Sequence, residues 1–148
     1  ARYGMRIVGP NCLGLIDTFA PINASFAAGM PDQGSIAFMS QSGALCTAIL
    51  DYALAENIGF SHFVSLGNKS DVDEVALLGA WQDDPQTNVV IAYIEGIKDG
   101  PRFMATARQA AQQADHRGQI GAHSVRVQSC VLSHGQPGRV RRRVRCRF

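Results

Sequence analysis

The chain has 148 residues, of which 46% are hydrophobic and 18% charged, and its formal net charge is +2. These values are typical of a soluble domain with a real core, and they exclude a protein of membrane-spanning helices, because no apolar run approaches the roughly 20 residues that cross a bilayer. The N-terminus also lacks the order of a signal peptide, so we expect a cytoplasmic protein, and a chain that begins inside a longer one.

The first 34 residues differ from the rest in their many turn-forming residues. Residues 6–9 are compatible with a short strand, residues 10–14 (Pro-Asn-Cys-Leu-Gly) predict a turn, and Pro21 and Pro31 indicate a loop. We interpret this region as the end of a preceding domain followed by a linker.

Three predicted strands follow, at residues 35–39, 61–66 and 89–94. The last of them, Val-Val-Ile-Ala-Tyr-Ile, is apolar on both faces, which is typical of a buried parallel strand. A covered central sheet is therefore expected.

A helical pattern follows each strand. Apolar residues recur at helical spacing over residues 45–54, and Gly59 suits the end of that helix. Asp71 and Asp73 are candidate caps of a second helix, and a third runs over residues 101–114. Alternating strands and helices predict an α/β fold, a parallel sheet layered with helices and joined by right-handed crossovers.

The pattern ends near Ala114, where the charge also changes. Residues 1–115 hold all 12 acidic residues and six of the 14 Lys and Arg, a formal charge of −6; residues 116–148 hold eight Arg and no acid, a charge of +8. No convincing fourth strand is recognisable in this irregular, Arg-rich tail.

Three interpretations of the tail remain open. The first is a basic arm that binds nucleic acid, although only Phe148 offers stacking and no binding module is recognised. The second is a disordered tail. The third, which we prefer, is the product of a shifted reading frame after about Asp115. The third hypothesis explains why the fold pattern and the motifs described next are lost at the same point.

Four motifs stand in a fixed order along the first 114 residues. They are residues 9–14 (Gly-Pro-Asn-Cys-Leu-Gly), 40–44 (Ser-Gln-Ser-Gly-Ala), 65–74 (Ser-Leu-Gly-Asn-Lys-Ser-Asp-Val-Asp-Glu) and 93–97 (Tyr-Ile-Glu-Gly-Ile). With these motifs the chain resembles the NDP-forming acyl-CoA synthetases, which include the ADP-forming acetyl-CoA synthetases and, more distantly, the succinyl-CoA synthetase α-subunit.

This resemblance implies a fold, an activity and a domain division. Members make acyl-CoA from an acid, CoA and ATP through an acyl phosphate and a phosphohistidine, with Mg²⁺ on the nucleotide and an ATP-grasp domain or β-subunit as partner. Residues 1–15 would end the CoA-binding Rossmann-like domain, 16–34 would be a linker, 35–115 would be part of the flavodoxin-like ligase domain, and 116–148 the tail. The chain would be an inactive fragment, because no segment matches the family's phosphorylated histidine; Ser133 and His134 only echo it.

The resemblance and the local chemistry together indicate three catalytic residues. Ser42 and Gly43 open a helix whose backbone N–H groups and dipole suit a phosphoryl group, although an isolated Ser-Gly would be read as an ordinary cap. Glu95 directly follows a buried strand, and in the family a glutamate here orients the imidazole. The alternative for Glu95 is a solvated carboxylate.

Three further residues are predicted to bind CoA or substrate. Asn11 and Cys12 match the family's turn near the acyl thioester, and Cys12 is expected to bind without a covalent role. Lys69 could face a phosphate or a carboxylate, although a lysine in such a loop is usually solvated. No metal ligands are assigned, and the cysteines, which lack metal-site spacing, are interpreted as reduced thiols.

Two other functions stay open from the sequence alone. The same module could be a CoA-sensing regulatory region of a protein acetyltransferase, which the flanking domains would reveal. A nucleic-acid-binding module is the third possibility, and it would depend on the Arg-rich tail.

Overall fold

A computed structural model describes residues 3–116 and 126–128. Within this part a six-stranded sheet has the order β2-β1-β4-β3-β5-β6. Strands β3, β4, β5 and β6 are parallel, whereas β1 is antiparallel to β4 and to β2. The strands are β1 (Gly14–Asp17), β2 (Ile22–Ser25), β3 (Gln33–Ser40), β4 (Phe60–Ser65), β5 (Val89–Tyr93) and β6 (Arg126–Gln128).

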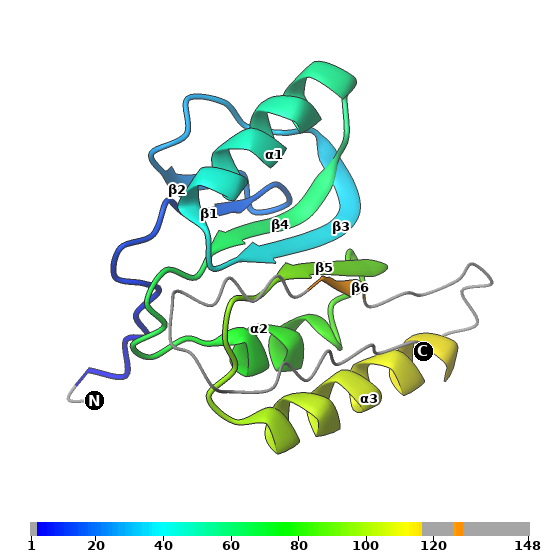
Figure 1. The fold of residues 1–148 in the computed structure, drawn as a ribbon. Coiled ribbons are helices and arrows are strands. Elements are labelled where there is room, and N and C mark those ends of the chain that lie inside the picture. The colour runs from blue at the N-terminus through cyan, green and yellow to red at the C-terminus, as the bar shows by residue number, and fades with distance from the viewer. Residues whose placement is uncertain (1–2, 117–125, 129–148) are drawn as a thin grey trace, which may run out of the picture.

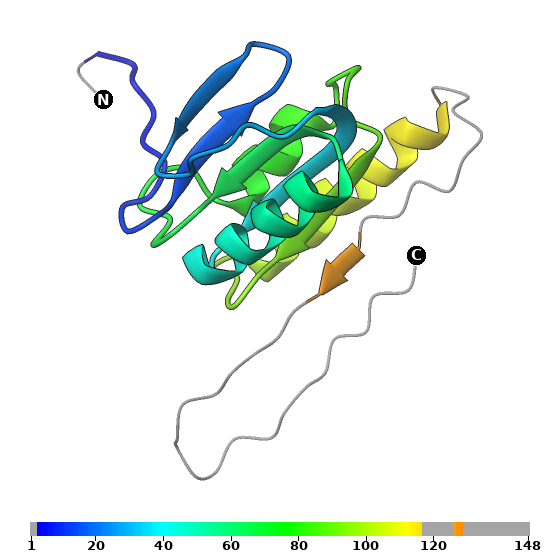
Figure 2. The ribbon, with the colours of Figure 1, turned by 90° about the horizontal axis from the view of Figure 1, so that it is seen from above.

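Helices cover both faces of the sheet, as Figures 1 and 2 show. Helix α1 (Gly43–Glu56) lies on one face, and α2 (Glu74–Trp81) and α3 (Gly100–His116) lie together on the other. The layered α/β fold with parallel central strands is thus confirmed. None of the helices in the described residues is long and apolar enough to cross a membrane.

Two buried clusters hold these layers together, because alternate strand residues face opposite sides. On one face, aromatic rings of the sheet pack on α1, with the Phe38 and Phe63 rings stacked at 4.8 Å between centroids. On the other face, smaller strand residues such as Ala37 and Ala92 pack under α2 and α3, where Phe103 is 3% exposed.

The structure corrects several expectations near the ends of elements. The expected linker, residues 16–34, contains the end of β1 and all of β2, so it contributes to the sheet. Residues 6–9 form no strand. Helix α1 is capped by Asn57, in the left-handed region at φ 55°, and not by Gly59. A three-residue strand, β6, lies beside β5, in the part of the chain where no convincing strand pattern was recognisable.

Candidate functional site

Three loops meet at one edge of the sheet, because β3, β4 and β5 are parallel and adjacent. Ser40, the last residue of β3, is in register with Ser65 of β4 and Tyr93 of β5. The backbone continues this pairing beyond the strands, since the Leu66 amide donates to the Ser40 carbonyl at 2.7 Å. The motifs that begin at residues 40, 65 and 93 therefore lie side by side.

The fourth motif, residues 9–14, joins the same edge through the loop after β4. The amide of Asn68 donates to the Pro10 carbonyl, and that of Ser70 to the Gly9 carbonyl, both at 2.9 Å. Gly67 permits this approach: its φ is +55°, and a Cβ there would lie 2.2 Å from the Pro10 oxygen. All four ordered motifs are thus brought together.

Ser42 and Gly43 form the start of α1 at this edge. Ser42 is the N-cap, and its Oγ accepts a hydrogen bond from the Leu45 amide at 3.3 Å. The first amides of a helix have no acceptor within it, and no acidic residue stands in the first turn of α1. Gly43 is exposed, with no atom within 4 Å of where its Cβ would stand. This helix start is open, uncharged and able to receive an anion.

Glu95 lies in the neighbouring turn after β5, and the side chain of Gln41 binds that turn. The Gln41 Oε1 accepts from the amides of Glu95 at 3.1 Å and Gly96 at 3.2 Å, while its Nε2 donates to the Gly96 carbonyl at 3.0 Å. The Glu95 residue is exposed. The structure therefore brings Glu95 to the same edge as Ser42 and Gly43. Gln41, which connects them, was not among the residues predicted for the site.

Lys69 is placed differently from the other predicted residues. Its side chain is 8% exposed, and its Nζ donates to Glu74 Oε2 at 2.9 Å and to the Gly96 carbonyl at 2.6 Å. The Glu74 side chain is 2% exposed. Because two of its three donors are used inside the protein, this geometry favours a structural role for Lys69 over contact with a ligand.

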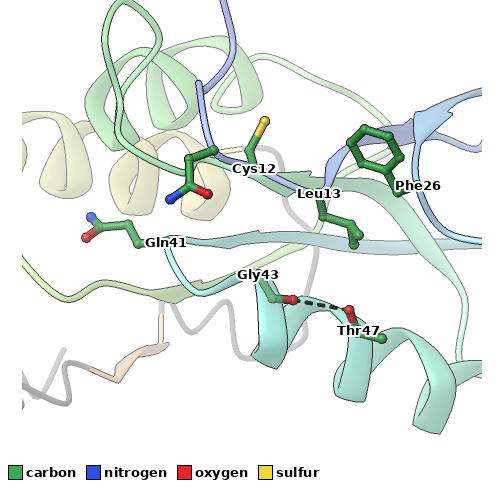
Figure 3. Close-up of a pocket in the computed structure, with 7 residues that line it drawn as sticks. Cys12, Leu13, Phe26, Gln41, Gly43 and Thr47 are labelled. Atoms are coloured by element: carbon green, nitrogen blue, oxygen red, sulfur yellow. Dashed lines mark hydrogen bonds between the residues drawn. The ribbon is translucent and has the colours of Figure 1, made fainter.

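An open pocket of about 550 Å³ lies between the segment before β1 and the start of α1 (Figure 3). Asn11, Cys12 and Gly43, three of the predicted residues, line it, whereas Ser42, Glu95 and Lys69 are not among its described lining residues. The complete described lining is Asn11, Cys12, Leu13, Phe26, Gln41, Gly43 and Thr47. None of these side chains is charged.

The two cysteines in the described residues are both free. Cys12 is half-buried, and its Sγ donates to the Val8 carbonyl at 3.8 Å. Cys46 is a fully buried residue of α1, and burial raises the pKa of its thiol. Cys46 is therefore a packing residue, and Cys130 and Cys146 lie outside the described residues.

His62 lies at the other end of the sheet, away from these loops. Its Nε2 is 2.9 Å from Asp84 Oδ2, its Nδ1 is 3.5 Å from Asp17 Oδ2, and its ring stacks on Trp81. The carboxyl pKa of Asp84 is lowered: although burial opposes this, hydrogen bonds from Thr87, a backbone amide and His62 outweigh it. Both ring nitrogens of His62 thus have a carboxylate partner.

In the described part of the chain no three acidic, histidine or cysteine side chains are grouped to hold a metal ion. The possible histidine echo at residues 133–134 lies outside the described residues, as does the tail except for residues 116 and 126–128. No histidine in the described range stands among the four motifs.

Comparison with known proteins identifies related sequences and structures. The model of the succinyl-CoA ligase like flavodoxin domain matches residues 33–115. The ADP-forming acetate–CoA ligase of Methanocaldococcus jannaschii is 48% identical over 112 residues, which are 76% of this chain and 16% of that protein. The α-subunit of the ADP-forming acetate–CoA ligase I of Pyrococcus furiosus is 44% identical, over 76% of this chain and 24% of the subunit.

Solved structures agree with this assignment. The apo form of acetyl-coenzyme A synthetase 1 from Ca. Korarchaeum cryptofilum superposes with a TM-score of 0.75 at 38% identity, covering 86% of this chain and 26% of that one. A structure of the same synthetase in complex with phosphate and ADP has a TM-score of 0.70 at 38% identity, covering 82% and 30%. This chain spans less than a third of each relative, and it belongs to the family of the succinyl-CoA ligase like flavodoxin domain.

Proposed function

We propose that this chain is part of an ADP-forming acyl-CoA synthetase and forms one side of the site that receives a phosphorylated histidine. The carrying observation is that the uncharged start of α1 and the exposed Glu95 lie at one edge of the sheet. An anion would be bound by the backbone N–H groups of Gly43 and its neighbours, and the Glu95 carboxylate would accept a ring N–H. In that arrangement the second imidazole nitrogen is free to carry the phosphoryl group.

The pocket beside the helix start is proposed to receive the acyl end of the thioester. Asn11 offers an amide, while Leu13 and Phe26 offer apolar surface. A second carboxylate in the acyl group would need a cationic partner, and the described lining provides none, since Lys69 is bound to Glu74. We therefore propose a monocarboxylic acid with an uncharged chain as the substrate class.

The remaining components are carried by other parts of the enzyme in this proposal. The histidine, the nucleotide with its Mg²⁺ and an ATP-grasp domain or β-subunit would meet this edge from outside the described residues. The structure of the related synthetase in complex with phosphate and ADP supports the nucleotide part of this proposal. A cytoplasmic location fits the same proposal.

The anion site is tested by following amide signals of the ¹⁵N-labelled chain by NMR during titration with phosphoramidate, which has the P–N bond of phosphohistidine. The Gly43 and Ala44 signals should shift. The start of α2 is an internal control, because its cap Asp73 and the first-turn Glu74 are both acidic and repel anions. Equal shifts at both helices, or none at α1, would contradict the proposal.

A matched variant separates anion binding from helix stability. Ser42→Asp keeps a good N-cap but places a carboxylate where the anion would bind, so it should abolish the phosphoramidate response without unfolding α1. The unchanged chain should also form no labelled phosphoenzyme with ATP. Formation of one would overturn the expectation that this chain lacks the reacting histidine.

A further inference from the structure

We propose that Gln41 is a positioning residue, which holds the Glu95 turn against the start of α1. Its role in catalysis rests on the function proposed above, whereas the hydrogen bonds that define it are present in the structure. Gln41 stands between the last residue of β3 and the cap of α1, so any group that it binds is fixed relative to the helix start.

One planar amide makes three of the contacts that fix the turn. Its oxygen accepts from the Glu95 and Gly96 amides, and its nitrogen donates to the Gly96 carbonyl. The Gln41 backbone amide adds a fourth, to the Tyr93 carbonyl at 3.1 Å. The carboxamide of a Gln side chain offers this acceptor and donor side by side on one rigid group.

A second loop reaches the same carbonyl from another direction. Lys69 Nζ donates to Gly96 O at 2.6 Å, and the ammonium is neutralised by Glu74. Lys98 in turn donates from Nζ to the Lys69 carbonyl at 3.0 Å. Gly96 O therefore receives bonds from the loops after both β3 and β4, and the turn after β5 is tied to each of its neighbours.

The connection continues to the helix start. The Ser42 amide donates to Ser40 Oγ at 3.0 Å, and the Ser40 hydroxyl donates to the Ser42 carbonyl at 3.1 Å. The backbone on both sides of Gln41 is thus fixed, while Glu95 stays exposed. A carboxylate on a fixed backbone loses less conformational entropy when it binds an imidazole than a carboxylate on a mobile turn does.

Amide hydrogen exchange tests whether Gln41 holds the turn. In Gln41→Ala the Glu95 and Gly96 amides should exchange roughly tenfold faster, the effect of losing one ordinary hydrogen bond each. Gln41→Glu should retain only part of their protection, because a carboxylate accepts both N–H groups but cannot donate to the Gly96 carbonyl as the Gln41 Nε2 does. Gln33→Ala is the matched control: Gln33 stands at the opposite end of β3, where its Nε2 bonds the Thr18 carbonyl at 3.0 Å, and the turn should be unaffected.

Two small-molecule probes test whether the hydrogen bonds from Gln41 to the Glu95 turn affect binding at the site. At a mildly acidic pH the second ring nitrogen of N-phosphoimidazole is protonated, so this probe should accept a hydrogen bond from the Gly43 amide and donate one to the Glu95 carboxylate. Phosphoramidate should accept the bond from the Gly43 amide but make none to Glu95. Gln41→Ala should weaken the first roughly tenfold and change the second less than about twofold. A merely structural role would weaken both equally or neither.

The outcomes separate the two proposals. If the unchanged chain binds both probes and Gln41→Ala alters neither their ratio nor the exchange of the turn, the inference is wrong and the proposed function stands. Exchange that rises throughout β3, β4 and β5 would also overturn it. If the unchanged chain binds neither probe, the proposed function fails and takes the catalytic role of Gln41 with it.

Discussion

Replacement of Lys69 by methionine should destabilise the domain by about 3–5 kcal/mol, the usual cost of leaving a buried charge without its partner. The expectation follows from burial: the two side chains of the pair are 8% and 2% exposed, and Nζ is 2.9 Å from Glu74 Oε2. Methionine fills a similar volume, so loss of packing is a minor contribution. Because domains of this size have a total stability of roughly 5–15 kcal/mol, the loss would remove a large part of it.

The assay is urea unfolding followed by tryptophan fluorescence, since Trp81 is a buried residue at the end of α2, the helix that carries Glu74. The double variant Lys69→Met with Glu74→Leu removes both charges and should recover most of the lost free energy. Glu74→Gln alone tests the pair from the other side. A single-variant loss below about 1 kcal/mol, or no recovery in the double variant, would refute the reasoning, because such values are typical of exposed pairs.

Three other predictions concern separate features. Gly67→Ala should abolish or strongly destabilise docking of the N-terminal segment, because the new Cβ meets backbone 2.2 Å away and φ is +55°; unchanged thermal unfolding would contradict this. The Arg6 guanidinium, by hydrogen bonding and charge, lowers the pKa of the Asp71 carboxyl, so this contact should be complete above the ordinary aspartate value of about 3.9 and lost as the pH falls through the lowered value. The Arg6 Nε–H signal in an NMR pH titration reports it, and a signal that does not respond to protonation of the Asp71 carboxyl would exclude the contact. Sequencing the coding DNA should reveal, in another frame after Asp115, a Lys-Pro strand and a Ser-His-Thr-Gly segment; their absence from both other frames ends the shifted-frame hypothesis.

The strands and helices between residues 33 and 114 could be predicted because each carries its own local pattern. Apolar runs located β3, β4 and β5, and Asp73 indeed caps α2 with a 2.9 Å bond to the Ala76 amide. The short strands β1 and β2 could not be predicted in this way. Each has four residues, and β2 is mostly exposed, so neither shows an alternation long enough to recognise.

The candidate site was partly predictable for a related reason. The position of Ser42 and Glu95 at this edge could be predicted because both follow predicted strands, where α/β folds place their sites. Gln41 was missed because its role depends on a turn 54 residues away in the chain. The bond of Lys69 to Glu74, five residues later, could not be predicted because the sequence does not show that the two side chains meet.

The antiparallel position of β1 has a consequence for the order in which the chain can fold. Ile16 is 1% exposed, and the pairing of β1 with β4 places it opposite Phe63 in the core cluster that α1 covers. During synthesis the ribosome releases β1 and β2 well before β4, and a two-stranded hairpin alone is marginal in water. The apolar residues of the β1–β2 hairpin therefore stay exposed to solvent until the following strands and helices have been synthesised. This long-range closure is expected to be among the slower steps of folding.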